Sequence, residues 1–337
     1  MTCEINIHLK LNNMLTNNIL GLHHVTALSS DAQQNLDFYA GILGLRLVKK
    51  TVNFDAPDVY HLYFGDEAGN PGTILTFFPY SGMPKGRKGN GQVTVTSFSV
   101  PENSLDYWTK RLNRFNIVCE PPRERFDDEL FVYFEDQDGL GIELVANKSD
   151  TREGFTDGLI PGEFVIRGFH SITMSVKDPE KTASLLTQQM DHTLIAENPD
   201  RYRFSPSGKP GGFVDILSSA SELRSIGGAG TVHHVAFATQ SDRTQLEIRE
   251  KLLSTRTADP TPVIDRMYFH SVYFREPGGV LFEVATSDIG MTMDEPKDKL
   301  GESLKLPPWH ENKRKEIEAN LSPITLNEGK FRDYARL

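Results

Sequence analysis

Cysteine is almost absent from this chain, which has two cysteines in 337 residues. With only Cys3 and Cys119 available, a disulfide framework of the kind that holds small secreted domains together is not expected. We therefore expect a protein of the reducing cytoplasm. Long apolar runs are absent as well. No segment approaches the ~20 apolar residues that a membrane-spanning helix needs, so no membrane partner is expected.

A block of basic residues is also missing. The chain has 36 Lys and Arg against 46 Asp and Glu, which gives a formal net charge of −10. Because phosphate binding needs a clustered basic face, a nucleic-acid partner is not expected. The content of 38% hydrophobic and 24% charged residues is that of an ordinary globular protein, long enough for more than one domain with a substantial core.

One pattern recurs four times along the chain: a short apolar strand, a helix, and further strands, the last of which follows a turn that contains glycine. In the first copy the helix predicted over Ala32–Leu43 has its apolar residues on one face, and Gly44 follows it as a stop signal. The opening strands are predicted over His23–Leu28, Thr94–Val100, His170–Val176 and His233–Ala238, the later helices over Ser104–Phe115, Pro179–Met190 and Arg243–Leu253, and the final strands over Thr73–Phe78, Gly141–Val145, Gly212–Leu217 and Val280–Ala285.

Each copy is therefore a βαβββ module. One such module cannot bury its sheet alone, so pairs of modules are expected to join their sheets. The predicted fold class is α+β, with four βαβββ modules that form two curved half-barrel cups.

The modules divide the chain into segments. Residues 1–18 are polar and Asn-rich and lack the features of a secretion signal, so we expect a flexible leader, with Met14 as an alternative start. Residues 19–148 and 167–290 are expected to form an N-terminal and a C-terminal domain of two modules each, joined by a linker over 149–166. The tail, 291–337, should contain a helix over Trp309–Leu321, introduced by two prolines.

Two of the opening strands begin with paired histidines, His23-His24 and His233-His234, and one final strand carries Glu283. Two imidazole nitrogens and one carboxylate oxygen form the ligand set that holds ferrous iron on one face and leaves other positions open. Successive strand residues face opposite sides, so strict alternation allows only one histidine of each pair to face a cup.

The neighbours of each pair favour the second histidine. His234 shares its face with Ala236 and Ala238, whereas the face of His233 is bulkier and suits the helix side. This favours His234 as a ligand and, by register, His24. A metal site is therefore expected at His24, His234 and Glu283.

The alignment of the four copies leaves two ways to pair them. The opening strands place His24, a Ser or Thr near Ser97, Ser171 and His234 in one column, and the final strands place Thr76, Glu143, Asp215 and Glu283 in another. Joining copies one and four gathers both histidines with Glu283, while copies two and three then contribute acids and serines without imidazole. Joining one with two and three with four would separate the histidines. Periodicity does not decide between them, and we prefer the first because it alone assembles the ligand set.

These motifs give the chain a specific resemblance. It resembles the vicinal oxygen chelate superfamily, which includes glyoxalases, bleomycin-resistance proteins and extradiol dioxygenases. Within it, the chain is similar to two-domain hydroquinone-type ring-cleaving dioxygenases over about residues 20–290. The motifs that carry this similarity are Tyr60-His61-Leu62-Tyr63-Phe64, Lys85-Gly86-Arg87-Lys88-Gly89, Arg167-Gly168-Phe169-His170-Ser171 and Tyr273-Phe274-Arg275-Glu276-Pro277-Gly278-Gly279.

The resemblance implies a function. It implies Fe(II) at the three ligands named above, with manganese or zinc able to replace it in purified protein. It also implies catalytic roles for His23, Arg266 and Tyr273. The implied reaction is the opening of a hydroquinone-type ring with O2, and the implied physiological role is the removal of toxic quinols.

Two other functions stay open on the sequence alone. A glyoxalase-like lyase or isomerase would use the same cup with another divalent metal and would consume no oxygen. A metal-free protein that sequesters a small aromatic would bind its ligand without turnover, but such a protein does not need the intact His/His/Glu set. The ring substituents, the native metal and the oligomeric state, a homo-oligomer included, are likewise open.

Overall fold

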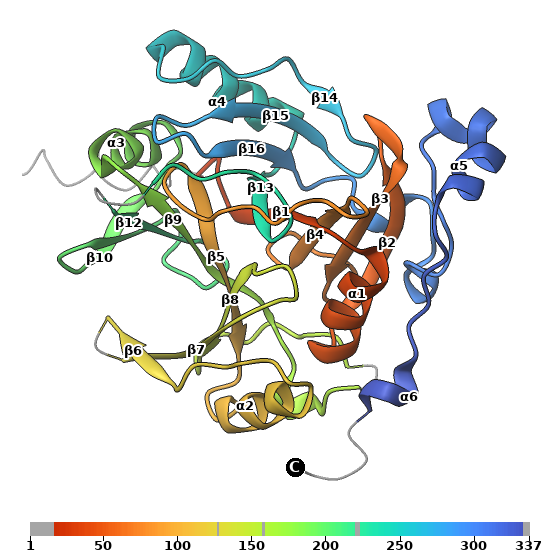
Figure 1. Ribbon diagram of the computed structural model, residues 1–337. Helices are drawn as coiled ribbons and strands as arrows, with labels where there is room; N and C mark the ends of the chain where they lie inside the picture. Colours follow the sequence, from red (N-terminus) through yellow and green to blue (C-terminus); the bar gives the residue numbers. More distant parts are fainter. Residues whose placement is uncertain (1–16, 127, 157–158, 220–222, 333–337) are drawn as a thin grey trace, which may run out of the picture.

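The protein contains two curved eight-stranded sheets (Figure 1). The computed structural model describes residues 17–126, 128–156, 159–219 and 223–332. Most of the expected leader and the last residues of the expected tail lie outside the described residues. The first sheet has the strand order β14 (Ile264–Asp265), β15 (His270–Arg275), β16 (Leu281–Thr286), β13 (Thr231–Thr239), β1 (Gly21–Ser29), β4 (Ile74–Pro79), β3 (Ala56–Gly65) and β2 (Arg46–Asn53). The second has the order β10 (Thr193–Glu197), β11 (Arg201–Ser205), β12 (Phe213–Ser218), β9 (Gly168–Val176), β5 (Gln92–Val100), β8 (Gly141–Ala146), β7 (Glu129–Glu135) and β6 (Arg123–Arg125).

This strand order decides how the modules pair. Modules one and four share the first sheet and meet at the antiparallel pair β1–β13, while modules two and three share the second sheet and meet at β5–β9. The preferred pairing is confirmed, and the alternative pairing is wrong. The α+β class with two half-barrel cups is also confirmed. Each half of the chain, 19–148 and 167–290, contributes one module to each sheet.

One helix follows the opening strand of each module. These are α1 (Ala32–Leu36), which continues as the π-helical turn η1 (Asp37–Ile42), α2 (Leu105–Arg114), α3 (Pro179–Gln189) and α4 (Asp242–Thr255). The first helix begins where Asp31 Oδ1 accepts a hydrogen bond from the Gln34 amide, at 2.8 Å. The predicted single helix over Ala32–Leu43 is thus correct in place but changes its winding half-way. It ends at Gly44, whose φ of +68° lies in the left-handed region that favours glycine.

The helices pack against the sheets through one apolar cluster. Leu36, Trp108, Leu185 and Ile248, one from each of α1 to α4, are buried in this cluster together with strand residues such as Val235. A buried side chain of this size contributes roughly 1.5–3 kcal/mol. Because side chains alternate along a strand, a strand residue next to Val235 faces away from the helices and toward the inside of the cup.

The seam between β1 and β13 is not fully regular. In the pairing of β1 with β13, neither His23 nor His233 has a partner residue, and the register shifts at each of them. Each of these residues therefore lies at a β-bulge. A bulge leaves one residue unpaired and re-aims its side chain. The rule of strict alternation, used above to orient the paired histidines, therefore does not hold at either pair.

After β16 the chain runs along the edge of the first sheet, beside β2 and β3 (Figure 1). This tail contains η3 (Met291–Met293), η4 (Lys297–Lys299), η5 (Pro308–Lys313), α5 (Arg314–Asn320) and α6 (Glu328–Phe331), and the linker contains the short turn η2 (Gly162–Phe164). The predicted helix over Trp309–Leu321 is present as the 3-10 turn η5 followed by α5. Among the described residues, no helix is both long and apolar enough to cross a membrane.

Candidate metal centre

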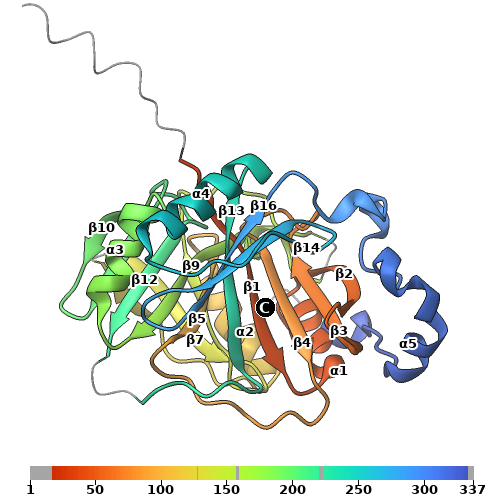
Figure 2. The ribbon, with the colours of Figure 1, turned by 90° about the horizontal axis from the view of Figure 1, so that it is seen from above.

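Three neighbouring strands of the first sheet carry the predicted ligands. Strands β16, β13, β1 and β4 lie side by side when the molecule is seen from above (Figure 2). His24 in β1 is opposite Ala236 in β13, and Ala236 is in turn opposite Glu283 in β16, while His234 pairs with Thr26. Ala236, with its small side chain, thus lies between His24 and Glu283 in the sheet. The register of distant strands therefore places all three ligands on one face.

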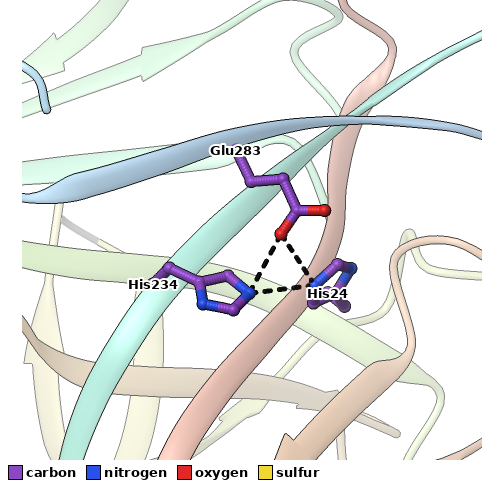
Figure 3. Close-up of side chains that lie close together, drawn as sticks. All are labelled: His24, His234 and Glu283. Carbon is purple, nitrogen blue, oxygen red and sulfur yellow. Dashed lines mark hydrogen bonds and ion pairs between the residues drawn. The ribbon is translucent and has the colours of Figure 1, made fainter. Parts of the chain in front are cut away.

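The donor atoms of these residues converge closely (Figure 3). The Nε2 atoms of His24 and His234 are 3.3 Å apart, and Glu283 Oε2 lies 3.3 Å from the first and 3.0 Å from the second. All three side chains are buried, with exposed fractions of 2%, 5% and 0%. Within the described part of the chain, this is the one group of His, Cys, Asp or Glu residues close enough to share a metal ion.

The hydrogen bonding of Glu283 tests whether a metal ion fits. Its Oε1 accepts a hydrogen bond from Ser271 Oγ at 2.5 Å, but Oε2 has no hydrogen-bond partner among the described residues despite its nearness to both imidazoles. Buried carboxylate oxygens are rarely left without a partner. Two donors ~2.1 Å from one ion lie roughly 3.0–3.4 Å apart at octahedral or tetrahedral angles, which matches the observed separations. The residues therefore fit a divalent metal.

A chain of hydrogen bonds orients His24. His23 Nε2 lies 3.2 Å from the carbonyl oxygen of Thr286, which can only accept, so this nitrogen carries the proton. The other ring nitrogen of neutral His23 is then an acceptor, and it lies 2.9 Å from His24 Nδ1. His24 must donate from Nδ1, which leaves the lone pair of Nε2 directed at the metal position. His233 and His234 show the same contact between Nδ1 atoms, at 2.7 Å.

The electrostatic environment favours the metal-binding forms of His234 and Glu283. Burial, and then the nearby His24, lower the pKa of His23 to about 3, and burial lowers the pKa of His234. Burial acts to raise the pKa of Glu283, but interactions with His24 and His234 hold it well below its ordinary value. Neutral imidazole and ionised carboxylate are the forms that coordinate a divalent ion.

A cavity of about 270 Å³ adjoins the three donors. A cavity of ~150 Å³ lined by apolar side chains can hold a benzene molecule, so this one has room for a single ring with small substituents. Its walls combine aromatic and polar side chains. They are formed by His24, Leu28, Asn53, Phe54, Asp55, His61, Tyr63, Phe78, Tyr80, His233, His234, Arg266, Phe269, Tyr273 and Leu281.

The predicted residues Arg266 and Tyr273 both line this cavity, whereas His23 does not. Tyr273 lies opposite Glu283 in the sheet, and its ring is 5.6 Å from that of His234. Arg266 Nε donates a hydrogen bond to the Tyr273 hydroxyl at 3.3 Å. Burial raises the pKa of Tyr273, so its hydroxyl keeps its proton at neutral pH. Since the hydroxyl oxygen accepts from Arg266, its own proton stays available to the cavity.

Sequence reasoning did not predict His61 as a site residue, because no other module has a histidine at the matching position. His61 Nε2 lies 2.9 Å from Thr76 Oγ1, and its Nδ1 lies 2.9 Å from the Tyr63 hydroxyl. Thr76, which the alignment places in the same column as Glu283, also contacts Thr26, with 2.8 Å between the two Oγ1 atoms. The alternation in the motif around residues 60–64 could have indicated that His61 and Tyr63 share one face. His233, expected on the helix side, also lines the cavity because of its bulge.

The second cup has different chemistry at the matching positions. Its acids are paired with arginines: Glu143 with Arg125 at 2.8 Å, and Asp215 with Arg203 at 2.7 Å and with Arg201 at 3.0 Å, while His170 lies 3.2 Å from Glu129. The pairing corrects one aligned position. In the second sheet Ser97 is opposite Ser171, and in the first sheet Ala236 is opposite His24. Ser97 is therefore equivalent to Ala236. The residue equivalent to His234 is Val95, two positions before Ser97. The second cup therefore lacks the ligand set.

A larger hollow of about 700 Å³ lies beside the cavity and shares Leu28, His233 and Leu281 with it. It contains none of the three donors. Its lining includes the exposed ends of Lys177 and Arg275. We therefore place the chemistry in the smaller cavity, which the donors line.

Comparison with known proteins identifies the family. Residues 21–144 match the family described as the Glyoxalase/Bleomycin resistance protein/Dioxygenase superfamily. MhqO of Bacillus subtilis, provisionally named a ring-cleaving dioxygenase, is 42% identical over 313 residues, which are 92% of this chain and 98% of MhqO. The chain belongs to this superfamily. The resemblance drawn from the sequence motifs is confirmed.

Other members of the superfamily extend the comparison. The chlorohydroquinone/hydroquinone 1,2-dioxygenase of Sphingobium indicum is 34% identical and covers 90% of this chain and 96% of its own length. A solved structure of a provisionally named dioxygenase from Bacillus subtilis has a TM-score of 0.88 at 42% identity, covering 93% and 99% of the two chains. Glyoxalase I from Zea mays, at 12% identity and a TM-score of 0.61, covers 79% of this chain and 92% of its own, and shares the fold alone.

Proposed function

We propose that this protein is an Fe(II)-dependent dioxygenase that opens hydroquinone-type aromatic rings with O2. The observation that carries the proposal is the convergence of His24, His234 and Glu283 on the wall of a cavity with room for one substituted ring. A ligand set of two histidines and one carboxylate is typical of iron oxygenases. The names of MhqO and of the Sphingobium relative support the same class.

The metal would be held by His24, His234 and Glu283. When bound, iron supplies Lewis acidity toward a ring hydroxyl and a path for electrons from ring to oxygen. The protein fixes the three donors beforehand. Ser271 orients the carboxylate of Glu283, and the burial of the donors leaves them little freedom to turn away. We assign His23 to this task as well, because it contacts His24 and does not reach the cavity.

The remaining lining residues act on the ring. Tyr273 can donate a hydrogen bond or a proton to a ring oxygen, since its own oxygen is occupied by Arg266. The aromatic side chains of Phe78 and Phe269 form apolar walls that hold the ring and exclude water. The cavity thus binds the substrate by contacts beyond the metal, which a para-hydroquinone needs because its two hydroxyls cannot both reach one ion.

Oxygen uptake tests the proposal. The metal-free protein would be loaded under argon with iron, manganese or zinc in separate samples and then given hydroquinone and air. With iron we expect oxygen and ring to be consumed in equal amounts, and the Glu283→Gln variant treated in the same way should consume neither. Turnover without oxygen uptake would favour a lyase instead, and binding without turnover under every metal would favour a sequestering protein.

A further inference from the structure

One rim of the cavity is the turn between β2 and β3. Asn53, Phe54 and Asp55 form this turn, and all three line the cavity. On the cavity side the turn has few strong contacts. Asp55 Oδ2 lies 3.1 Å from Arg266 Nη1, but the Asp55 side chain is 76% exposed, and exposed ion pairs stabilise little. Asn53 Nδ2 donates to the Tyr80 hydroxyl at 3.1 Å. These contacts alone leave the turn weakly held.

The tail supports the same turn from the other side. His310 Nε2 lies 2.9 Å from the carbonyl oxygen of Phe54, and because that oxygen can only accept, the imidazole is the donor. The Trp309 ring meets the Phe54 ring edge to face, with centroids 5.6 Å apart and planes at 85°. Both contacts converge on Phe54. Its ring therefore lies between the tail and the cavity.

The segment that supplies these contacts, residues 304–310, is called the strap below. It is attached to β2 independently of the turn. The Lys305 amide donates to the Lys50 carbonyl at 2.9 Å, and Leu306 is buried with Val52 and with Ile317 of α5. The strap thus has its own anchor on the sheet. It can fix the position of the turn rather than follow it.

We propose that Phe54 is a specificity-determining residue for ring substituents and that His310, in the strap, is its positioning residue. The inference deepens the proposed function and rests on it for the identity of the substrate. Phe54 packs against the buried cluster that includes Tyr63 and Phe269 at the site. It also packs against the cluster in which Leu306 of the strap is buried. A displacement of the turn would widen the cavity at this wall. Bulkier rings would then be accepted more readily.

Substrate selection tests the role of His310. The His310→Ala variant should keep its bound metal, while the ratio of kcat/KM between hydroquinone and tert-butylhydroquinone falls by about 3- to 10-fold, the effect of one lost hydrogen bond. His310→Gln retains an N–H donor and should restore the ratio. Lys315→Gln, on the exposed face of α5, is the matched control and should not change it. An unaltered ratio in His310→Ala would overturn the proposal.

Fluorescence provides a readout that does not depend on turnover. The chain has two tryptophans. Trp108 is fully buried, whereas Trp309 is 48% exposed and its ring contacts that of Phe54. Titration of the iron-loaded protein with hydroquinone under argon should change the emission with saturation, and Trp309→Phe should abolish the change. A normal fluorescence response without oxygen uptake in air would contradict the proposed dioxygenase function but not the proposed role of the strap. Normal oxygen uptake without a fluorescence response would contradict the proposed role of the strap but not the proposed dioxygenase function.

Discussion

His24 and His234 lie diagonally across the β1–β13 seam, where His24 is opposite Ala236 and His234 is opposite Thr26, and their Nε2 atoms are 3.3 Å apart. No local contact in the chain could bring these two residues together. Their meeting depends on the register of two strands from opposite halves of the sequence. A slip of one residue would turn one imidazole to the helix side, so the buried face that sets the register also maintains the metal site.

Replacement of Glu283 by glutamine tests the ligand set. The amide can still accept the hydrogen bond from Ser271, but it removes the negative charge that faces the two imidazoles. We expect metal affinity to fall by at least ~100-fold while the fold is retained. Chelator competition and metal analysis would measure this change. Full metal content in the variant would remove Glu283 from the ligands.

Substitutions at the ion pairs of the second cup should change the stability of the protein rather than its metal binding. Asp215 is fully buried and ion-paired with Arg203 and Arg201. Arg203 also pairs with Glu129, but Asp215→Asn removes one acid from the cluster and leaves a positive charge in excess. We expect a loss of about 3–5 kcal/mol in the free energy of unfolding, measured with urea, and unchanged metal content. The exposed pair of Arg314 and Glu318 supplies the control: Glu318→Gln should cost about 0–1 kcal/mol. Equal losses in the two variants would contradict this view of the second cup.

Tyr273 and Tyr133 occupy matching positions, opposite Glu283 and Glu143 respectively. If Tyr273 donates to the substrate, Tyr273→Phe should keep metal and substrate binding but slow turnover by roughly 10²–10⁴-fold. Tyr133→Phe, in the cup without the ligand set, should leave turnover unchanged. Steady-state kinetics with matched metal content would separate the two, and an unaltered kcat in Tyr273→Phe would reduce its role to packing.

The buried His192 should make the free energy of unfolding depend on pH. Burial lowers its pKa to about 4, and its Nδ1 lies 2.6 Å from the Met190 carbonyl oxygen. The unfolded chain, with an ordinary pKa of ~6.5, binds the proton first as the pH falls, so this histidine should remove up to about 3 kcal/mol of stability between pH ~6.5 and ~4. His192→Asn retains a donor toward Met190 and should show a smaller loss over that window in urea titrations. An identical pH profile would contradict the assignment.

The choice between substrates tests the subclass. Catechol can chelate a metal through adjacent oxygens, whereas a para-hydroquinone must be held by the cavity, with Arg266 and Tyr273 as the nearest polar contacts. Small substituted hydroquinones should therefore exceed catechol in kcat/KM by about 10–200-fold if a single apolar contact decides the preference. Iron-loaded protein that cleaves catechol readily and no hydroquinone would contradict the subclass and retain the dioxygenase.

Much of the fold could be predicted because its signals are local. The helical spacing of Leu36 and its neighbours and the stop at Gly44 specify a helix from a few adjacent residues, and the repetition of that pattern shows the modules. The ligand positions followed from the same repetition, since equivalent places in equivalent modules meet when the modules pair. The winding change at η1 and the bulges at His23 and His233 could not be predicted, because they depend on contacts with other strands and helices.

The sequence by itself thus determined the modules, the residues able to hold a metal and the superfamily. Only the tertiary structure decided which modules share a sheet, that His61 and Phe54 reach the cavity, and that the tail supports one rim of it. The physical reason is the range of the interactions. Propensity and periodicity act over a few residues, whereas strand pairing is selected by the burial of whole faces formed from segments far apart in the chain.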